Sequence, residues 1–207
     1  MSRFESVEEL VTHLSRPLER RRVVGIAGAP GAGKSTIAEA VARSIPTAAL
    51  LPMDGYHYPQ SVLRDLGRRD RMGAPDTFDV DAFVATLESV RVSDVAVLAR
   101  GFDRTIEEPV PDAITIAPEK CTVIVEGNYL LLDSGGWERV APLLDESFVI
   151  EVDDAVRIER LVARHIRFGK SEPDARAWAL GPDESNARLI AATASRADHV
   201  IALDAGR

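Results

Sequence analysis

Apolar positions along the chain follow two alternating patterns. Short runs of consecutive apolar, often β-branched residues predict buried strands, and they occupy residues 22–27, 48–53, 122–125, 148–152 and 199–203. Between them, apolar residues recur three or four positions apart, which predicts amphipathic helices at residues 6–20, 36–45, 79–92, 137–144, 154–168 and 183–194. Strands that alternate with helices predict an α/β fold, in which one parallel sheet carries helices on both faces.

Three stretches depart from this alternation. Residues 56–72 are polar and rich in arginine, which predicts an irregular or helical excursion. Residues 95–117 begin and end with short apolar runs around a polar turn and predict a small β-ribbon insert. Residues 164–182 join the end of a helix to a polar segment that contains two glycines and two prolines, and they predict a lid. No repeat or long linker divides the chain, so a single domain over residues 1–207 is expected.

The composition is that of a globular protein. Hydrophobic residues make up 45% of the 207 residues and charged residues 28%. The net charge of -8 argues against general polyanion binding, so no nucleic-acid partner is expected. Cys121 is the single cysteine; it opens an apolar run and is expected in the core, with no intrachain disulfide and a reducing, cytoplasmic location. Because the sequence has neither a signal-peptide pattern nor an apolar run long enough to cross a bilayer, no membrane partner is expected.

The strongest chemical signal follows the first predicted strand. Residues 28–36 fit the pattern G-x-x-x-x-G-K-[ST], a phosphate-binding loop, and lie between a strand and a helix. In such a loop, backbone N–H groups and the positive end of the helix dipole surround phosphate oxygens. Lys34 is expected to contact the β- and γ-phosphates of ATP and to act in catalysis, and the Ser35 hydroxyl to bind Mg²⁺. A glycine-rich turn that only caps a helix is the alternative. The nucleotide-binding residues predicted here are Gly28, Ala29, Pro30, Gly31, Ala32, Gly33, Lys34, Ser35 and Thr36.

Acidic residues end two further apolar strands. Ligands of parallel α/β sheets bind beyond the carboxyl ends of the strands, so these acids are candidates for chemistry. Asp54 is expected to accept the proton of an attacking hydroxyl, although a turn or helix cap also uses aspartate. Glu126 is expected to bind Mg²⁺, because a buried glutamate without a partner is costly. Which acid contacts the metal directly is left open.

Arginines mark one face of the helix predicted at residues 154–168. Arg160, Arg164 and Arg167 stand at i, i+4 and i+7 and therefore share that face. Such a stripe is often only a solvated surface. This one leads into the predicted lid, and phosphoryl transfer needs cations that balance the charge of the transferred group. Arg164 and Arg167 are therefore expected to be catalytic.

A weaker signal concerns the molecule that accepts the phosphoryl group. The candidates for an acceptor pocket are His57, Tyr58, Phe102, Asp103 and Arg104. Each is weak alone, since a histidine also suits a surface and a phenylalanine suits a core. A cluster of arginines fits either an anionic substrate or a solvated face, and it consists of Arg64, Arg68, Arg69 and Arg71. Trp178 fits either stacking on a nucleotide base or simple packing.

Together, these segments resemble the small-molecule P-loop kinases, which include uridine kinase, bacterial pantothenate kinase, phosphoribulokinase and the fructose-transport kinases. Besides the glycine loop, the segments are Met53-Asp54-Gly55-Tyr56-His57, Phe102-Asp103-Arg104, Val125-Glu126-Gly127-Asn128-Tyr129 and Arg164-His165-Ile166-Arg167. The likeness is closest to the branch that resembles pantothenate kinase and the fructose-transport kinases. The resemblance implies a P-loop fold with a five-stranded parallel sheet of order 2-3-1-4-5, Asp54 as the base and lid-helix arginines at Arg164 and Arg167. It also implies that Phe102 and Asp103 lie near the acceptor.

Two departures from uridine kinases count against uridine as the acceptor. Phe168 stands where those enzymes typically have aspartate, and residues 104–109 lack their histidine-containing stretch. The expected function is transfer of the γ-phosphoryl group of ATP–Mg²⁺ to a hydroxyl of a sugar, a pantothenate-like acid or a nucleoside. A nucleotide-binding regulatory protein or switch without metabolite kinase activity is the alternative. The predicted ribbon also offers a surface for a homodimer.

Overall fold

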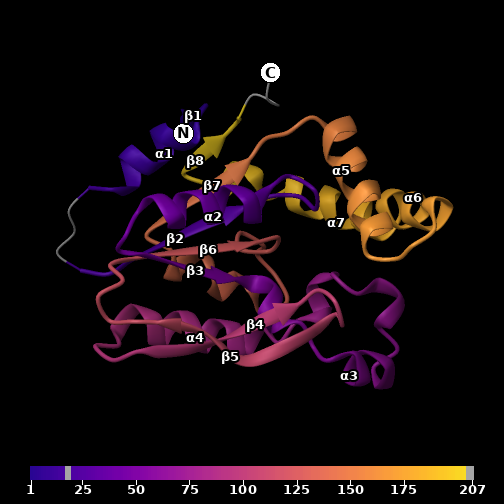
Figure 1. Ribbon diagram of the computed structural model, residues 1–207, viewed down its shortest axis with the longest axis horizontal. Coiled ribbons are helices and arrows are strands. Elements are labelled where there is room, and N and C mark those ends of the chain that lie inside the picture. Colours follow the sequence, from indigo (N-terminus) through magenta and orange to yellow (C-terminus); the bar gives the residue numbers. More distant parts are fainter. Residues whose placement is uncertain (17–19, 204–207) are drawn as a thin grey trace.

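The computed structural model describes residues 1–16 and 20–203. Its helices and strands alternate along the chain, as the apolar pattern predicts (Figure 1). In chain order they are β1 (Ser2–Phe4), α1 (Val7–Leu14), β2 (Arg22–Ala27), α2 (Lys34–Ser44), β3 (Ala48–Pro52), α3 (Gln60–Asp65), α4 (Val80–Val92), β4 (Val97–Asp103), β5 (Glu108–Ile116), β6 (Thr122–Gly127), β7 (Glu146–Ile150), α5 (Asp154–Arg167), α6 (Glu172–Leu180), α7 (Pro182–Ala191) and β8 (His199–Ile201). Short 3₁₀ helices connect several of them: η1 (Met53–Tyr56), η2 (Arg69–Arg71), η3 (Pro75–Thr77), η4 (Trp137–Arg139), η5 (Ala141–Leu143) and η6 (Ala194–Arg196).

Six parallel strands form the main sheet, in the order β1-β8-β7-β2-β6-β3. The expected count of five strands is wrong. The five expected strands, numbered 1 to 5 in chain order, are β2, β3, β6, β7 and β8, and they do run in the order 2-3-1-4-5. The sixth strand is β1, which is added at the edge beside β8. Three residues with mostly exposed side chains make no apolar run, so local pattern does not predict this strand.

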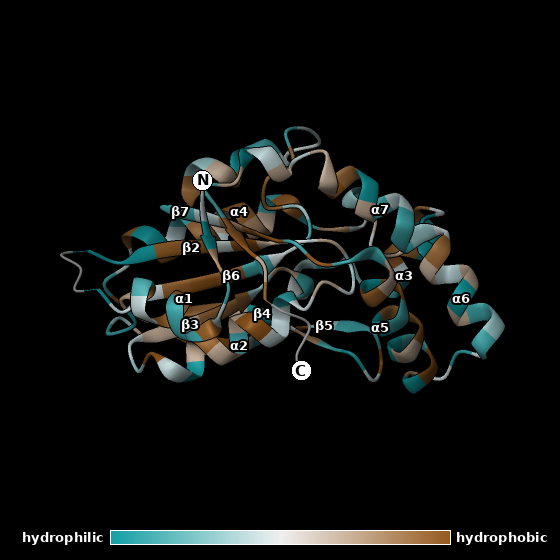
Figure 2. Cartoon of the chain, turned by 90° about the horizontal axis from the view of Figure 1, so that it is seen from above, coloured by the Kyte–Doolittle hydropathy of each residue, from teal (hydrophilic) through white to brown (hydrophobic). Residues whose placement is uncertain are grey.

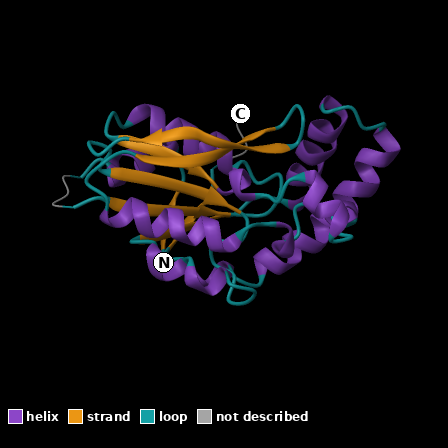
Figure 3. Ribbon diagram, turned by 90° about the horizontal axis from the view of Figure 1, so that it is seen from below, coloured by secondary structure: helices purple, strands orange, loops and turns teal. Residues whose placement is uncertain are grey.

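Helices cover both faces of the sheet and create two apolar cores. On one face, Val24 and Ile26 of β2 pack in the core to which α1 and α2 contribute. On the other face, Val23 packs in the core to which α4 and the β4–β5 ribbon contribute (Figures 1 and 3). Because side chains alternate across a strand, a strand covered on both faces reads as one continuous apolar run, which Figure 2 shows for β2 and β6.

Several expected elements differ in detail from the observed ones. The segment predicted as one helix at 137–144 forms η4 and η5 instead, and Pro142 stands in the first turn of η5. The polar segment 169–182 contains α6, which Ser171 caps through its side chain. Cys121 is exposed, not in the core. The predicted N-terminal helix is observed as α1, and residues 17–19 of its expected range lie outside the described residues.

The antiparallel β4–β5 ribbon is longer than expected and contains a bulge between Ala99 and Gly101. The ribbon packs so closely on η1 that a Cβ at Gly55 would collide with the backbone carbonyl of Arg100. Gly127 at the end of β6 allows an equally close approach, since a Cβ there would lie 2.6 Å from the Cβ of Met53. Within residues 1–16 and 20–203, no helix has both the length and the apolar character that a membrane span requires.

We expect Leu10→Ala to lower the free energy of unfolding by about 2–5 kcal/mol, because the side chain of Leu10 in α1 is fully buried in the core between α1 and the sheet. Leu66→Ala removes the same atoms from a side chain that is 46% exposed, so its effect should stay below about 1 kcal/mol. Urea unfolding of both variants measures the difference. Equal effects would show that α1 does not belong to the cooperative core.

Candidate functional site

The glycine loop leads from the end of β2 into α2. Gly31 and Gly33 adopt φ values of +80° and +95°, a left-handed conformation that glycine takes without strain. No side chain caps α2 at Gly33, so the first amides of the helix are available to an anion. A Cβ at Gly31 would collide with the backbone carbonyl of Arg157, which shows that α5 packs directly against the loop.

Lys34 begins α2 and donates a hydrogen bond to the carbonyl of Ala29 at 3.0 Å. Burial lowers the pKa of Lys34 to about 8, although the carboxylates of Glu126 and Asp54 act in the opposite direction. An anion such as a phosphate group would favour the charged ammonium. The loop and its lysine are therefore suited to phosphate.

Glu126 lies near the end of β6 and is 4% exposed. The Ser35 hydroxyl donates a hydrogen bond to its Oε1 at 2.9 Å. Burial raises the pKa of Glu126, and the nearby charge of Asp54 raises it further. A divalent cation would relieve the repulsion between the two acids. Hydroxyl and carboxylate oxygens are the donors that Mg²⁺ prefers, so these residues fit that ion.

Asp54 lies in η1, directly after β3, and Arg104 from the turn of the ribbon donates to its Oδ2 at 2.6 Å. Burial acts to raise the pKa of Asp54, but the cations around it, Arg104 first among them, outweigh burial and hold the pKa below its ordinary value. The carboxylate is therefore ionised at neutral pH. His57 is buried, stacks on Phe78 at 3.9 Å between ring centroids, and has a pKa that burial lowers.

One cavity brings together residues from every part of the predicted site. The predicted residues that line it are Pro30, Lys34, Ser35, Asp54, His57, Phe102, Arg104, Glu126 and Arg164. Three of the predicted catalytic and acceptor residues lie outside its lining. The Tyr58 backbone is bonded to Thr77, and Asp103 accepts from the Thr105 amide within the ribbon turn. Arg167 is exposed at the end of α5.

The cavity is also lined by residues that were not predicted as site residues. They come from the segment between β3 and α4, from the ribbon turn, from the residue after β6 and from the region of α5 to α7 at the end of the sheet in Figure 1. They include Met72, Gly73, Phe78, Glu107, Asn128, His165, Lys170, Asp183 and Asn186. His165 lies 2.7 Å from an oxygen of Asp183, which ties α5 to α7. Asn128 and His165 lie in segments that carry the family resemblance, whereas the polar residues of α7 have the pattern of any solvated helix face.

Two residues that the sequence left undecided also line this cavity. Arg69 of η2 belongs to the arginine cluster, and it contacts Glu107 of the ribbon turn at 2.7 Å. Trp178 of α6 faces the cavity, and the ammonium of Lys170 lies 4.5 Å from the centre of one of its rings.

Comparison with known proteins supports a nucleotide-dependent site. No family model matches the chain. A proposed uridine kinase of Schizosaccharomyces pombe is 33% identical over 180 residues, which are 80% of this chain and 73% of that protein. A pantothenate kinase of Agrobacterium fabrum is 32% identical over 61% of this chain and 42% of that protein. The crystal structure of a proposed fructose transport system kinase from Silicibacter sp. TM1040 superposes with a TM-score of 0.86 at 33% identity, covering 94% of this chain and 98% of that one.

The lowered pKa of Lys34 has a consequence for stability. The folded-state pKa of about 8 is below the ordinary value of 10.5, so the unfolded chain binds more protons between these values. The resulting destabilisation is complete below about pH 8 and disappears as the pH rises toward 10.5. In the absence of ligand, Lys34→Met should stabilise the protein by about 1–2 kcal/mol at neutral pH.

Denaturant unfolding near pH 7 and near pH 9.5 tests this, because the advantage of Lys34→Met should shrink at the higher pH. Lys120→Met removes the same charge from an exposed hydrogen bond and serves as the control. An advantage that is equal at both pH values would contradict the buried-ammonium explanation.

Proposed function

The chain belongs to the P-loop small-molecule kinases of the uridine kinase and pantothenate kinase group, and we propose that it transfers the γ-phosphoryl group of ATP to a hydroxyl of a small metabolite with the help of Mg²⁺. Membership makes it a phosphotransferase with a hydroxyl acceptor. The observation that carries the finer proposal is the meeting of Lys34, Asp54 and Glu126 in one cavity. Glu126 lies near the end of β6, Asp54 follows β3, and Lys34 follows the glycine loop after β2, so three neighbouring parallel strands bring them there.

The glycine loop would hold the β- and γ-phosphates through its amides and Lys34. Ser35 and Glu126 would hold Mg²⁺, which when bound supplies neutralisation of the phosphate charge. Arg164 lines the same cavity and would balance charge on the transferred group. Because Arg167 lies outside the lining of the cavity, we assign this role to Arg164 first.

Asp54 would act as the base. The acceptor hydroxyl would donate a hydrogen bond to its carboxylate, and the proton would pass to that carboxylate as the hydroxyl oxygen bonds to the γ-phosphorus. The bond from the γ-phosphorus to the bridging oxygen breaks, and ADP leaves. The low pKa of Asp54 supports this role, because the carboxylate is ionised before the acceptor binds.

The acceptor side of the cavity favours an anionic acceptor among the three candidate classes. It continues into a groove beside the ribbon turn, and Arg69, Arg104 and Lys170 line both. Among the described residues, Glu107 is the one acid that lines both the cavity and the groove. Cationic side chains therefore outnumber acidic ones in the part that the two share. A carboxylate or phosphate on the acceptor would bind to such a surface through charge-assisted hydrogen bonds. A pantothenate-like acid, a sugar acid or a sugar phosphate therefore fits better than a neutral sugar or nucleoside.

We expect Asp54→Asn to lower kcat by about 100-fold or more, because the amide cannot take the proton of the hydroxyl. ATP binding should be retained. ADP release in the presence of a panel of acids, sugars and nucleosides measures kcat, and titration with ATP measures binding. Asp65→Asn changes the same group on the exposed surface of α3 and should keep full activity. Full activity of Asp54→Asn would disprove its role as the base.

We expect Arg69→Gln to raise KM for an anionic acceptor by about 10- to 100-fold, because the substitution removes one or two charge-assisted hydrogen bonds to the acceptor. KM for ATP should be unchanged. Arg64→Gln is the matched control, because Arg64 belongs to the same arginine cluster but is exposed and lines neither the cavity nor the groove. If only neutral acceptors are phosphorylated, or if both variants have the same effect, the anionic acceptor is excluded while the kinase activity itself stands.

A further inference from the structure

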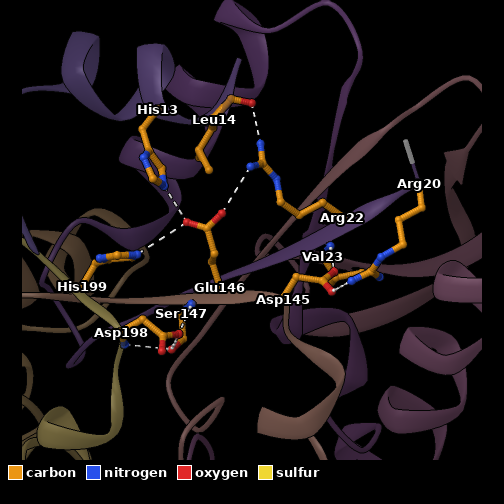
Figure 4. A network of polar contacts seen from close by, with 10 residues as sticks. All are labelled: His13, Leu14, Arg20, Arg22, Val23, Asp145, Glu146, Ser147, Asp198 and His199. Carbon is orange, nitrogen blue, oxygen red and sulfur yellow. Dashed lines mark hydrogen bonds and ion pairs between the residues drawn. The ribbon is translucent and has the colours of Figure 1, made fainter. Parts of the chain in front are cut away.

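A second cluster of chemically active side chains lies at the amino ends of the strands, at the other end of the sheet from the cavity. Glu146 begins β7, His199 begins β8, and His13 lies in the last turn of α1. In the parallel pairing of β7 with β8, His199 stands opposite Phe148, two residues after Glu146, so Glu146 and His199 lie near each other on one face of the sheet. Figure 4 shows both imidazoles pointing toward the Glu146 carboxylate. The proposed phosphoryl transfer uses none of these residues.

We propose that His13, Glu146 and His199, which we call the histidine cluster, bind a divalent transition-metal ion, and that Zn²⁺ is the ion they fit best. Nε2 of His13 lies 2.5 Å from Oε2 of Glu146, and Nε2 of His199 lies 3.5 Å from the same oxygen. All three donor atoms lie within 4.8 Å of one another. Three elements that are distant in sequence thus bring their donors to one point.

The donor set matches the chemistry of zinc. Two imidazole nitrogens and one carboxylate oxygen are a common set of protein ligands for this ion. Donors of a tetrahedral zinc ion stand about 3.4 Å apart, given metal–ligand distances of about 2.0–2.2 Å. Binding therefore requires the contact between His13 and Glu146 to open by roughly 1 Å, with water as a fourth ligand.

The surroundings of the cluster hold the donors in place. Nη1 of Arg22 donates to Oε1 of Glu146 at 3.2 Å, which leaves Oε2 directed at the two histidines. Phe4 packs against the rings of His13 and His199, with centroid distances of 5.1 and 5.7 Å. Hydrogen bonds to a ligating carboxylate and an apolar shell around the ligands are features that orient metal sites.

The cluster is also open to solvent. The side chains of His13, His199 and Glu146 are 19%, 18% and 23% exposed, so an ion can reach them without unfolding of the sheet. A bound ion would connect α1 with the first residues of β7 and β8. Because an ion that binds only the folded state stabilises it, zinc should raise Tm. At free zinc about 100-fold above Kd, we expect a rise of about 5–10 °C.

Calorimetric titration of chelator-treated protein with ZnCl₂, in excess Mg²⁺ and without nucleotide, tests the proposal. One equivalent should bind, and His13→Gln and His199→Gln should each weaken binding about 10-fold or more. His165→Gln removes a histidine from the other cavity and should leave the binding unchanged. Loss of binding in His165→Gln with full binding in the other two variants would overturn the proposal.

A second measurement does not depend on how well the variants fold. In NMR spectra of the natural protein that resolve imidazole nitrogens, zinc should shift Nε2 of His13 and His199 while His57 and His165 stay unchanged. Absence of zinc binding, or several weak equivalents that shift all four histidines alike, would show adventitious binding only and reject the site.

Discussion

The candidate site depends on the parallel register of β2, β6 and β3. Ala27 stands opposite Gly127, and Pro52 stands opposite Glu126, so the glycine loop, Glu126 and Asp54 start from one level of the sheet. A shift of one residue in either pairing would turn every side chain of the shifted strand to the other face. The two covered faces prevent such a shift, because each strand is apolar on both sides and the two cores require different side chains. The positions of the glycine loop, Glu126 and Asp54 are therefore set by backbone pairing.

The polar groups placed there do not satisfy one another completely. Burial lowers the pKa of Lys34 and raises that of Glu126, so each group is less easily charged than it would be in water. A phosphate beside the lysine and a cation beside the glutamate would remove both penalties. The site is thus organised for its ligands at some expense of its own stability, as expected where function sets the sequence.

The sequence predicts well those features that depend on local pattern. Consecutive apolar residues identified five of the six strands of the main sheet, and the predicted residues Lys34, Asp54 and Glu126 line one cavity. It predicts poorly the features that tertiary contacts determine. The edge strand β1 is held by pairing with β8, and α6 lies within the polar, glycine- and proline-containing segment that was predicted as a lid. Arg69 and Asp183 enter the cavity because their elements fold over it, and no local pattern separates such residues from a solvated surface.

The bond between Arg104 and Asp54 also bears on selectivity against water. In the proposed mechanism Asp54 would activate whichever hydroxyl reaches it, and water is always present. The Arg104 guanidinium donates to Oδ2 of Asp54 in the absence of an acceptor, so a water molecule that approaches this oxygen must compete with a charge-assisted bond of 2.6 Å. An acceptor that carries its own anionic group can draw Arg104 toward itself and release the carboxylate, whereas water has no such group. The turn of the ribbon would thereby restrain wasteful hydrolysis of ATP and link consumption of the nucleotide to the presence of the correct acceptor.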